Sequence, residues 1–233
     1  MKAAQLVLRA VFAAQAFGFS ACALADAPAH VVPAPRVDEA KTHAASTETA
    51  ILSGGCFWGM QGVFEHVNGV REVVAGYAGG SAATAQYETV SSGSTGHAES
   101  VKIVFDPSAV TYGEILRVYF SVAHDPTELN RQGPDSGTQY RSDVFYFTPT
   151  QEKIARAYVA QLERAHAFND PIVTRVDKFV GFYPAEGYHQ DYLLHNPDNP
   201  YIMINDVPKI ANLKRLYPEL YRDSPVRLAS AWH

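Results

Sequence analysis

The chain has 233 residues, 47% of them hydrophobic and 18% charged, which is enough to build one well-buried domain. The formal net charge of -5 gives no basic surface, so nucleic acid is not an expected partner. No group of Cys and His residues has the spacing of a zinc site, so no metal site is expected.

Residues 1–25 are typical of a secretory signal peptide. Lys2 and Arg9 precede a mostly apolar run that ends in Ala23-Leu24-Ala25, an A-x-A cleavage motif ahead of Asp26. A competing interpretation is a lipoprotein signal in which Cys22 is acylated. Both interpretations predict an exported, periplasmic protein and remove Cys22 from the chemistry of the mature chain.

The next residues, 26–47, are rich in Ala, Pro and small polar types without apolar periodicity, and we expect a flexible linker there. The periodic segments follow, so the domain is predicted over 48–223, with a short tail at 224–233.

Hydrophobic periodicity predicts strands and helices that alternate along the domain. The strands are short and several connections lack a full crossover helix, which favours an α+β fold with a mixed sheet and flanking helices. The expected strands are 49–52, 71–77, 100–105, 140–147 and 172–180, and the expected helices are 57–67, 112–122, 149–166, 186–194 and 208–217.

Cys56 lies between glycines and aromatics where the first strand gives way to the first helix. A helix N-terminus favours an anion, so the thiolate is expected to be more stable than that of a free cysteine. Phe57 and Trp58 offer an apolar wall for a methyl or thioether group. The structural alternative is that Cys56 is a small buried hydrophobe among core aromatics.

Several polar groups are candidates to serve this thiol. A carboxylic acid held near an apolar pocket has a raised pKa and can donate a proton to a leaving oxygen, and tyrosine hydroxyls are neutral donors. Each candidate alone is equally consistent with a surface or core position. The candidates are Glu99 with His97 at the entry of a strand, Tyr87, Asp135, Tyr140, and the segment 187–192 that holds His189.

Taken together, these segments resemble the peptide methionine sulfoxide reductase A family over residues 48–221. The combination is specific, although each piece alone is not. The matching motifs are Gly55-Cys56-Phe57-Trp58-Gly59, Gly76-Tyr77-Ala78-Gly79-Gly80, Tyr87, Gly96-His97-Ala98-Glu99, Asp106-Pro107, His124-Asp125-Pro126, Gly137-Thr138-Gln139-Tyr140-Arg141-Ser142 and His189-Gln190-Asp191-Tyr192.

The resemblance implies a ferredoxin-like split βαβ core and reduction of the S epimer of methionine sulfoxide in proteins, with the free amino acid as a further candidate substrate. It implies that Cys56 attacks the sulfoxide sulfur, that Glu99 protonates its oxygen, and that Tyr87 and Tyr140 hydrogen-bond to that oxygen. Phe57 and Trp58 would hold the methyl group.

Many members of the family carry a resolving cysteine near the C-terminus, whereas residues 199–233 contain none. The resulting sulfenic acid must then be reduced by an external thiol, either a small thiol or a thioredoxin-like protein. No bound cofactor is expected, and we expect a monomer that acts on oxidised proteins.

Two other classes of function stay open. A Cys-His hydrolase or acyltransferase would use His97 or His189 as the base and would need no reductant. A binding module for methionine-containing peptides would bind its ligand and tolerate loss of the Cys56 thiol.

Overall fold

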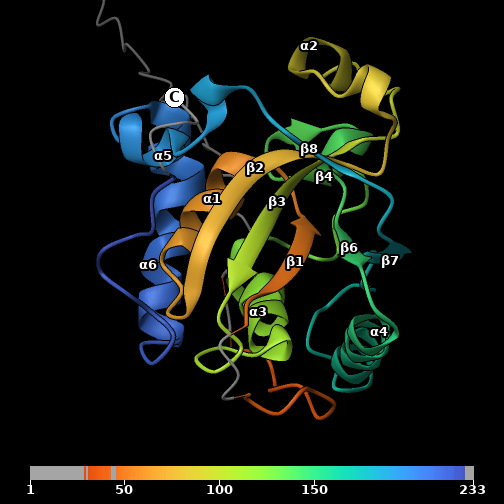
Figure 1. The fold of residues 1–233 in the computed structure, drawn as a ribbon, viewed down its shortest axis with the longest axis vertical. Helices are drawn as coiled ribbons and strands as arrows, with labels where there is room; N and C mark the ends of the chain where they lie inside the picture. The colour runs from red at the N-terminus through yellow and green to blue at the C-terminus, as the bar shows by residue number, and fades with distance from the viewer. Residues whose placement is uncertain (1–28, 30, 43–45, 229–233) are drawn as a thin grey trace, which may run out of the picture.

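The structure, a computed structural model, describes residues 29, 31–42 and 46–228 (Figure 1). The predicted signal peptide at 1–25, with Cys22, lies outside the described residues. Among those that are described, no helix is long and apolar enough to cross a membrane.

A six-stranded sheet in the order β7-β6-β1-β3-β2-β8 forms the centre of the domain. All neighbouring strands are antiparallel except β6 and β7. The four strands β6-β1-β3-β2 form a split βαβ arrangement, which confirms the predicted α+β fold with a mixed sheet. The strands are β1 (Glu48–Ser53), β2 (Val70–Ala78), β3 (Ala98–Phe105), β6 (Asp143–Tyr146), β7 (Arg175–Lys178) and β8 (Phe182–Pro184).

Helices cover the sheet, with α1 and α6 side by side and α4 near the opposite edge (Figure 1). The main core lies between the sheet and these helices, and includes Leu52, Phe64 and Leu162. A small cluster, Ile51, Ala78 and Phe145, is separate from it. The helices are α1 (Phe57–Glu65), α2 (Tyr87–Val90), α3 (Tyr112–Val118), α4 (Pro149–Arg164), α5 (Tyr192–His195) and α6 (Val207–Leu216).

Local sequence explains where two helices begin. The Thr111 hydroxyl accepts a hydrogen bond from the Glu114 N–H, and the Glu114 side chain accepts one from the Thr111 N–H, which is a capping box. At α4, Thr148 caps the helix and Pro149 occupies its first turn. Both starts agree with the predicted helices.

Some predicted boundaries were wrong. The strand expected at 140–147 begins only at Asp143, because a 3₁₀ turn over Thr138–Tyr140 precedes it. The helix expected at 112–122 continues from α3 as a π-helical segment, Tyr119–Ala123, and a second such segment, Ile202–Asp206, precedes α6. The loop after β2 contains the short helix α2. The small ribbon of β4 (Arg131–Gln132) and β5 (Asp135–Ser136) was not expected.

The prediction of a flexible linker at 26–47 was wrong for residues 31–42, which pack against the domain. Val32 is fully buried, and its carbonyl accepts a hydrogen bond from Arg117 Nε. The Pro33 carbonyl accepts one from Tyr158 Oη at 2.7 Å. Side chains of α3 and α4 thus satisfy backbone groups of this segment, so it can pack on the domain without forming a helix or strand.

Asp38 anchors the same segment to the beginning of α3. Its carboxylate accepts hydrogen bonds from Thr111 Oγ1 at 2.6 Å and from the Gly113 N–H at 2.9 Å. A negative charge at a helix N-terminus is favourable, so this contact stabilises both the segment and the helix.

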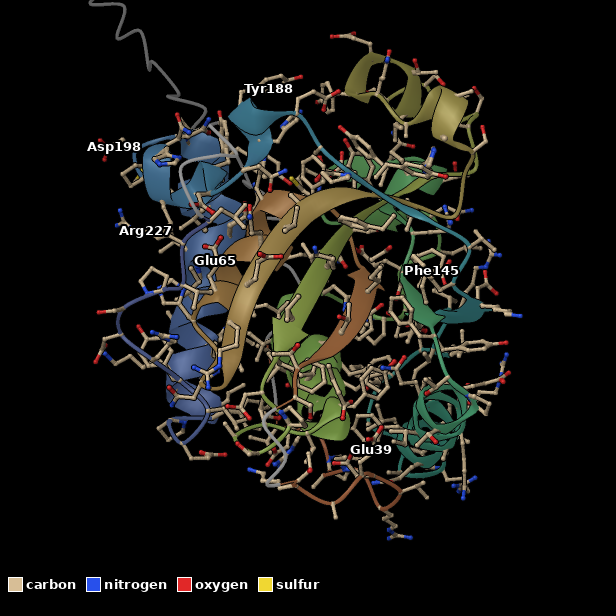
Figure 2. All side chains as sticks on the ribbon, in the orientation of Figure 1. Glu39, Glu65, Phe145, Tyr188, Asp198 and Arg227 are labelled. Atoms are coloured by element: carbon tan, nitrogen blue, oxygen red, sulfur yellow. The ribbon has the colours of Figure 1, made fainter. Side chains whose placement is uncertain are left out.

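Replacing Asp38 with Ala is therefore expected to lower the melting temperature by about 2 °C, which corresponds to about 0.5–1 kcal/mol in a domain of this size. Thermal unfolding followed by circular dichroism checks this. Asp198→Ala, at a surface position (Figure 2), is the matched control. Equal melting temperatures for wild type and Asp38→Ala would contradict the anchoring role.

Candidate active site

Cys56 lies in the turn that joins β1 to α1. Gly55 has a φ of +89°, and a Cβ at this position would lie 2.6 Å from Cβ of Gln132. Only glycine combines this backbone with so close an approach. The turn places Cys56 directly before the first helical residue, with 9% of its surface exposed.

Glu99 reaches the same turn from β3. Because β1 and β3 are antiparallel, with Leu52 opposite Val101, the end of β1 lies beside the beginning of β3. Glu99 is 4% exposed, and its Oε2 accepts a hydrogen bond from the Phe57 N–H at 3.0 Å. Burial raises the pKa of Glu99 to about 8, although this hydrogen bond opposes the rise. The side chain is therefore a neutral carboxylic acid at pH 7.

The prediction that the Cys56 thiolate is stabilised was wrong for this structure. Burial, followed by the charges of Glu99 and Asp206, raises the pKa of Cys56 well above its ordinary value. A hydrogen bond from the Trp58 backbone lowers it, as a helix N-terminus should, but with a smaller effect. Loss of water around the sulfur thus outweighs the helix, and the resting thiol is protonated.

The aromatic residues predicted to bind substrate come together around His189. Trp58 Nε1 donates a hydrogen bond to His189 Nδ1 at 3.2 Å, and the His189 ring lies 5.0 Å from that of Phe57 and 4.5 Å from that of Tyr87. Trp58 also stacks on Tyr192 at 3.8 Å. Phe57 is buried and Trp58 is half-buried, so together they form a fixed apolar wall next to Cys56.

The remaining predicted residues, Tyr140 and Asp135, are half-buried. Burial and the charge of Glu99 raise the pKa values of both Tyr140 and Tyr87, so each hydroxyl remains a donor. The hydroxyl of Tyr201 donates a hydrogen bond to Asp135 Oδ2. Asp135 is therefore linked to the aromatic wall, because the Tyr201 ring packs edge-on against Trp58.

Sequence reasoning missed Tyr201, one of 13 tyrosines, which no motif distinguishes. It also missed Glu186, whose carboxylate accepts hydrogen bonds from Tyr77 Oη at 2.8 Å and from the Tyr87 N–H at 2.9 Å. Glu186 fixes α2 over the site. Its place directly before the candidate segment 187–192 was the available signal.

His97 has a structural position. Its Nδ1 accepts a hydrogen bond from the Gly80 N–H at 3.2 Å, and its Nε2 lies 2.9 Å from the Ser81 carbonyl oxygen. Both ring nitrogens therefore contact the loop after β2, which argues against His97 as the base of a hydrolase. Within the described parts of the chain, no three His, Cys, Asp or Glu side chains are grouped as metal ligands.

Comparison with known proteins agrees with this geometry. The family model described as peptide methionine sulfoxide reductase matches residues 48–220. The chain belongs to this family. The reductase "MsrA 2" of Mesorhizobium japonicum is 60% identical over 188 residues, covering 81% of this chain and 96% of that protein. "MsrA 2" of Synechocystis is 51% identical over 191 residues, covering 81% and 89%.

Solved reductase structures are similar as well. Reduced Mxr1 from Saccharomyces cerevisiae is 30% identical with a TM-score of 0.60, covering 70% of this chain and 92% of that one. Methionine sulfoxide reductase A of Corynebacterium diphtheriae is 32% identical with a TM-score of 0.56, covering 75% and 88%. The reductase domain of this chain therefore has the fold of its family.

Replacing Glu99 with Gln is expected to speed the alkylation of Cys56 by iodoacetamide at about pH 9, where the wild-type carboxyl, with a pKa of about 8, is mostly ionised. Its charge holds the thiol protonated, and each unit by which the pKa of Cys56 falls raises the thiolate fraction about tenfold. Mass spectrometry gives the rates. The difference should shrink at about pH 6, where Glu99 is neutral.

Glu88→Gln, which makes the same change at an exposed position, is the control for this experiment. Equal alkylation rates for wild type and Glu99→Gln at the higher pH would show that the Glu99 charge does not act on Cys56.

Proposed function

We propose that Cys56 and Glu99 carry out the reaction of the family in this chain, the thiol-dependent reduction of the S epimer of methionine sulfoxide to methionine. The observation that supports this most is a buried, neutral carboxylic acid at the same helix turn as a buried thiol. A sulfoxide oxygen is a strong acceptor and a poor leaving group until it is protonated. The reaction repairs oxidised proteins.

The raised pKa of Cys56 is compatible with attack, because Glu99 can move both protons. Glu99 gives its proton to the sulfoxide oxygen and, now a carboxylate, accepts the proton of the thiol while sulfur attacks sulfur. The hydroxyl then moves from the substrate sulfur to the Cys56 sulfur, which breaks both the S–O bond of the substrate and the S–S bond formed in the attack, and leaves a sulfenic acid on Cys56 and a free thioether. Cys56 is oxidised, methionine sulfoxide is reduced, and Glu99 again carries a proton when the step is complete.

The other predicted residues have roles that fit their contacts. Tyr87 and Tyr140 donate hydrogen bonds to the sulfoxide oxygen, since both hydroxyls stay protonated. Asp135 orients the site through Tyr201. Phe57 and Trp58 bind the methyl group by apolar contact, and His189 holds the Trp58 indole in place.

An external thiol regenerates the enzyme. Cys56 is the free cysteine of the described residues, and the sequence has one other, Cys22, in the predicted signal peptide. One thiol attacks the sulfenic sulfur and releases water, which leaves a mixed disulfide, and a second thiol then frees Cys56 as a thiol. A thioredoxin-like protein or a small thiol fits this role. The signal at 1–25 supports export, so the reductant would lie in the cell envelope.

The decisive test is the consumption of dabsylated methionine sulfoxide, resolved into its two epimers, with dithiothreitol as the reductant. Wild type should consume the S epimer alone, and Cys56→Ser should consume neither, because an alcohol is not deprotonated at this site. If neither epimer reacts with wild type, a binding module becomes the better explanation. Cleavage of esters without any reductant would favour the hydrolase.

Glu99→Gln should slow the single-turnover release of methionine by about 10²-fold, because it removes the acid. In wild type, this rate should fall as the pH rises through about 8, where Glu99 loses its proton. Rapid-quench measurements at saturating substrate test both statements. A pH profile that is flat across this range, or an unchanged rate in the variant, would exclude Glu99 as the proton donor.

A further inference from the structure

Asp206 and Lys209 form a buried ion pair that the mechanism above does not use. Asp206 ends the π-helical segment before α6 and has no exposed surface, and Lys209 is 9% exposed. Lys209 Nζ lies 3.4 Å from Asp206 Oδ1. Buried charges are unfavourable unless they are paired, so their presence calls for a specific reason.

Residues 203–209 reverse the usual pattern of burial, because apolar side chains are exposed and charged ones are buried. Met203, Ile204 and Val207 are exposed, whereas the two charged residues face the interior. Charged side chains are normally the ones in contact with water. The arrangement therefore directs a carboxylate and an ammonium group inward, at the expense of apolar burial.

This ion pair lies against the first turn of α1. A Cβ at Gly59 would be 2.0 Å from Asp206 Oδ1 and 3.3 Å from Lys209 Nζ, so only glycine leaves room for the pair. Gly59 is the third residue of α1 and Cys56 is the residue that precedes its first, so both belong to the beginning of this helix. The Cα–Cβ direction leans toward the helix N-terminus, so Asp206 lies on the side of the helix that holds Cys56.

The charge of Asp206 acts against the thiolate, because it raises the pKa of Cys56 after burial and Glu99 have done so. Asp206 is therefore not placed to activate the nucleophile. The oxidised cysteine is different, because a sulfenic acid carries a hydroxyl group that can donate a hydrogen bond to a carboxylate.

We propose that Asp206 accepts a hydrogen bond from the hydroxyl of the Cys56 sulfenic acid, with Lys209 as the positioning residue that holds the carboxylate in place. The proposal rests on the proposed function, since the sulfenic acid is the product of that reaction. A carboxylate neighbour favours the protonated sulfenic acid over the sulfenate anion. This matters for an enzyme whose described residues hold one cysteine, because the sulfenic acid must persist until an external thiol arrives.

The two forms of the oxidised cysteine react differently. The neutral sulfenic acid is attacked at sulfur by a thiol, which forms the mixed disulfide and releases water. The sulfenate attacks hydrogen peroxide through its sulfur, which breaks the O–O bond, oxidises Cys56 to the sulfinate and releases water. Asp206 therefore directs Cys56 toward regeneration and away from irreversible oxidation.

The test compares wild type with Asp206→Asn, which keeps the shape of the side chain and removes its charge. Each enzyme first receives one equivalent of methionine sulfoxide without thiol, and methionine is measured. One portion then receives hydrogen peroxide, and sulfinic acid on Cys56 is followed by mass spectrometry. Another portion receives dithiothreitol, and recovery of the thiol is followed. Asp223→Asn, in the exposed Lys214–Asp223 pair at the end of the same helix, is the control.

Asp206→Asn should form methionine as wild type does, yet accumulate sulfinic acid about tenfold faster and recover its thiol more slowly, whereas the control should match wild type. A general loss of structure would instead reduce methionine formation. If circular dichroism shows that Asp206→Asn does not fold, the double variant Asp206→Asn/Lys209→Met, which removes both charges, serves in its place.

Normal methionine formation together with a wild-type rate of sulfinic acid formation would overturn the proposal. Absence of methionine from the wild-type enzyme would overturn the proposed function, and this inference with it. The two failures are therefore distinguishable in the first step of the experiment.

Discussion

The hydrogen bond from the Phe57 N–H to the carboxyl group of Glu99 joins the first turn of α1 to the beginning of β3. It forms only if β1 and β3 pair in the observed register, and only if Gly55 lets the chain turn against Gln132. The same contact brings an acid to the nucleophile, and both groups are buried. Reactivity here thus depends on strand pairing and on a turn, and not on a flexible loop.

Burial and negative charge around Cys56 hold the resting thiol protonated. Its reactivity at neutral pH is then coupled to substrate, because Glu99, with a pKa of about 8, keeps its proton there until a strong acceptor occupies the site. A cysteine that rests as the protonated thiol is protected from oxidants and alkylating agents that are not its substrate, because these react with thiolates. The carboxylate of Asp206, which helps to keep the thiol protonated, is also suited to hold the product hydroxyl. One electrostatic arrangement therefore serves both halves of the catalytic cycle.

Much of this was predictable from sequence, and the exceptions have a common cause. A short apolar run predicted the strand before Cys56, apolar residues at spacings of three and four predicted the helix after it, and the motifs predicted Glu99. Each of these depends on a short-range pattern. The Cys56 pKa was mispredicted because a helix N-terminus is visible in the sequence, whereas desolvation depends on what packs around the sulfur. Tyr201 and Asp206 were missed because only tertiary packing brings them to α1. Residues 31–42 were mispredicted because their partners lie far along the chain.

Those distant partners impose an order on folding. The N–H of Val32 donates a hydrogen bond to Tyr217 Oη, 185 residues away, and that of Arg36 donates one to Gln161, 125 residues away. Contacts of such sequence separation form late, because the intervening chain must first be organised. Residues 31–42 are therefore expected to be among the last to dock, because their backbone groups stay accessible until Gln161 of α4 and Tyr217 are in place.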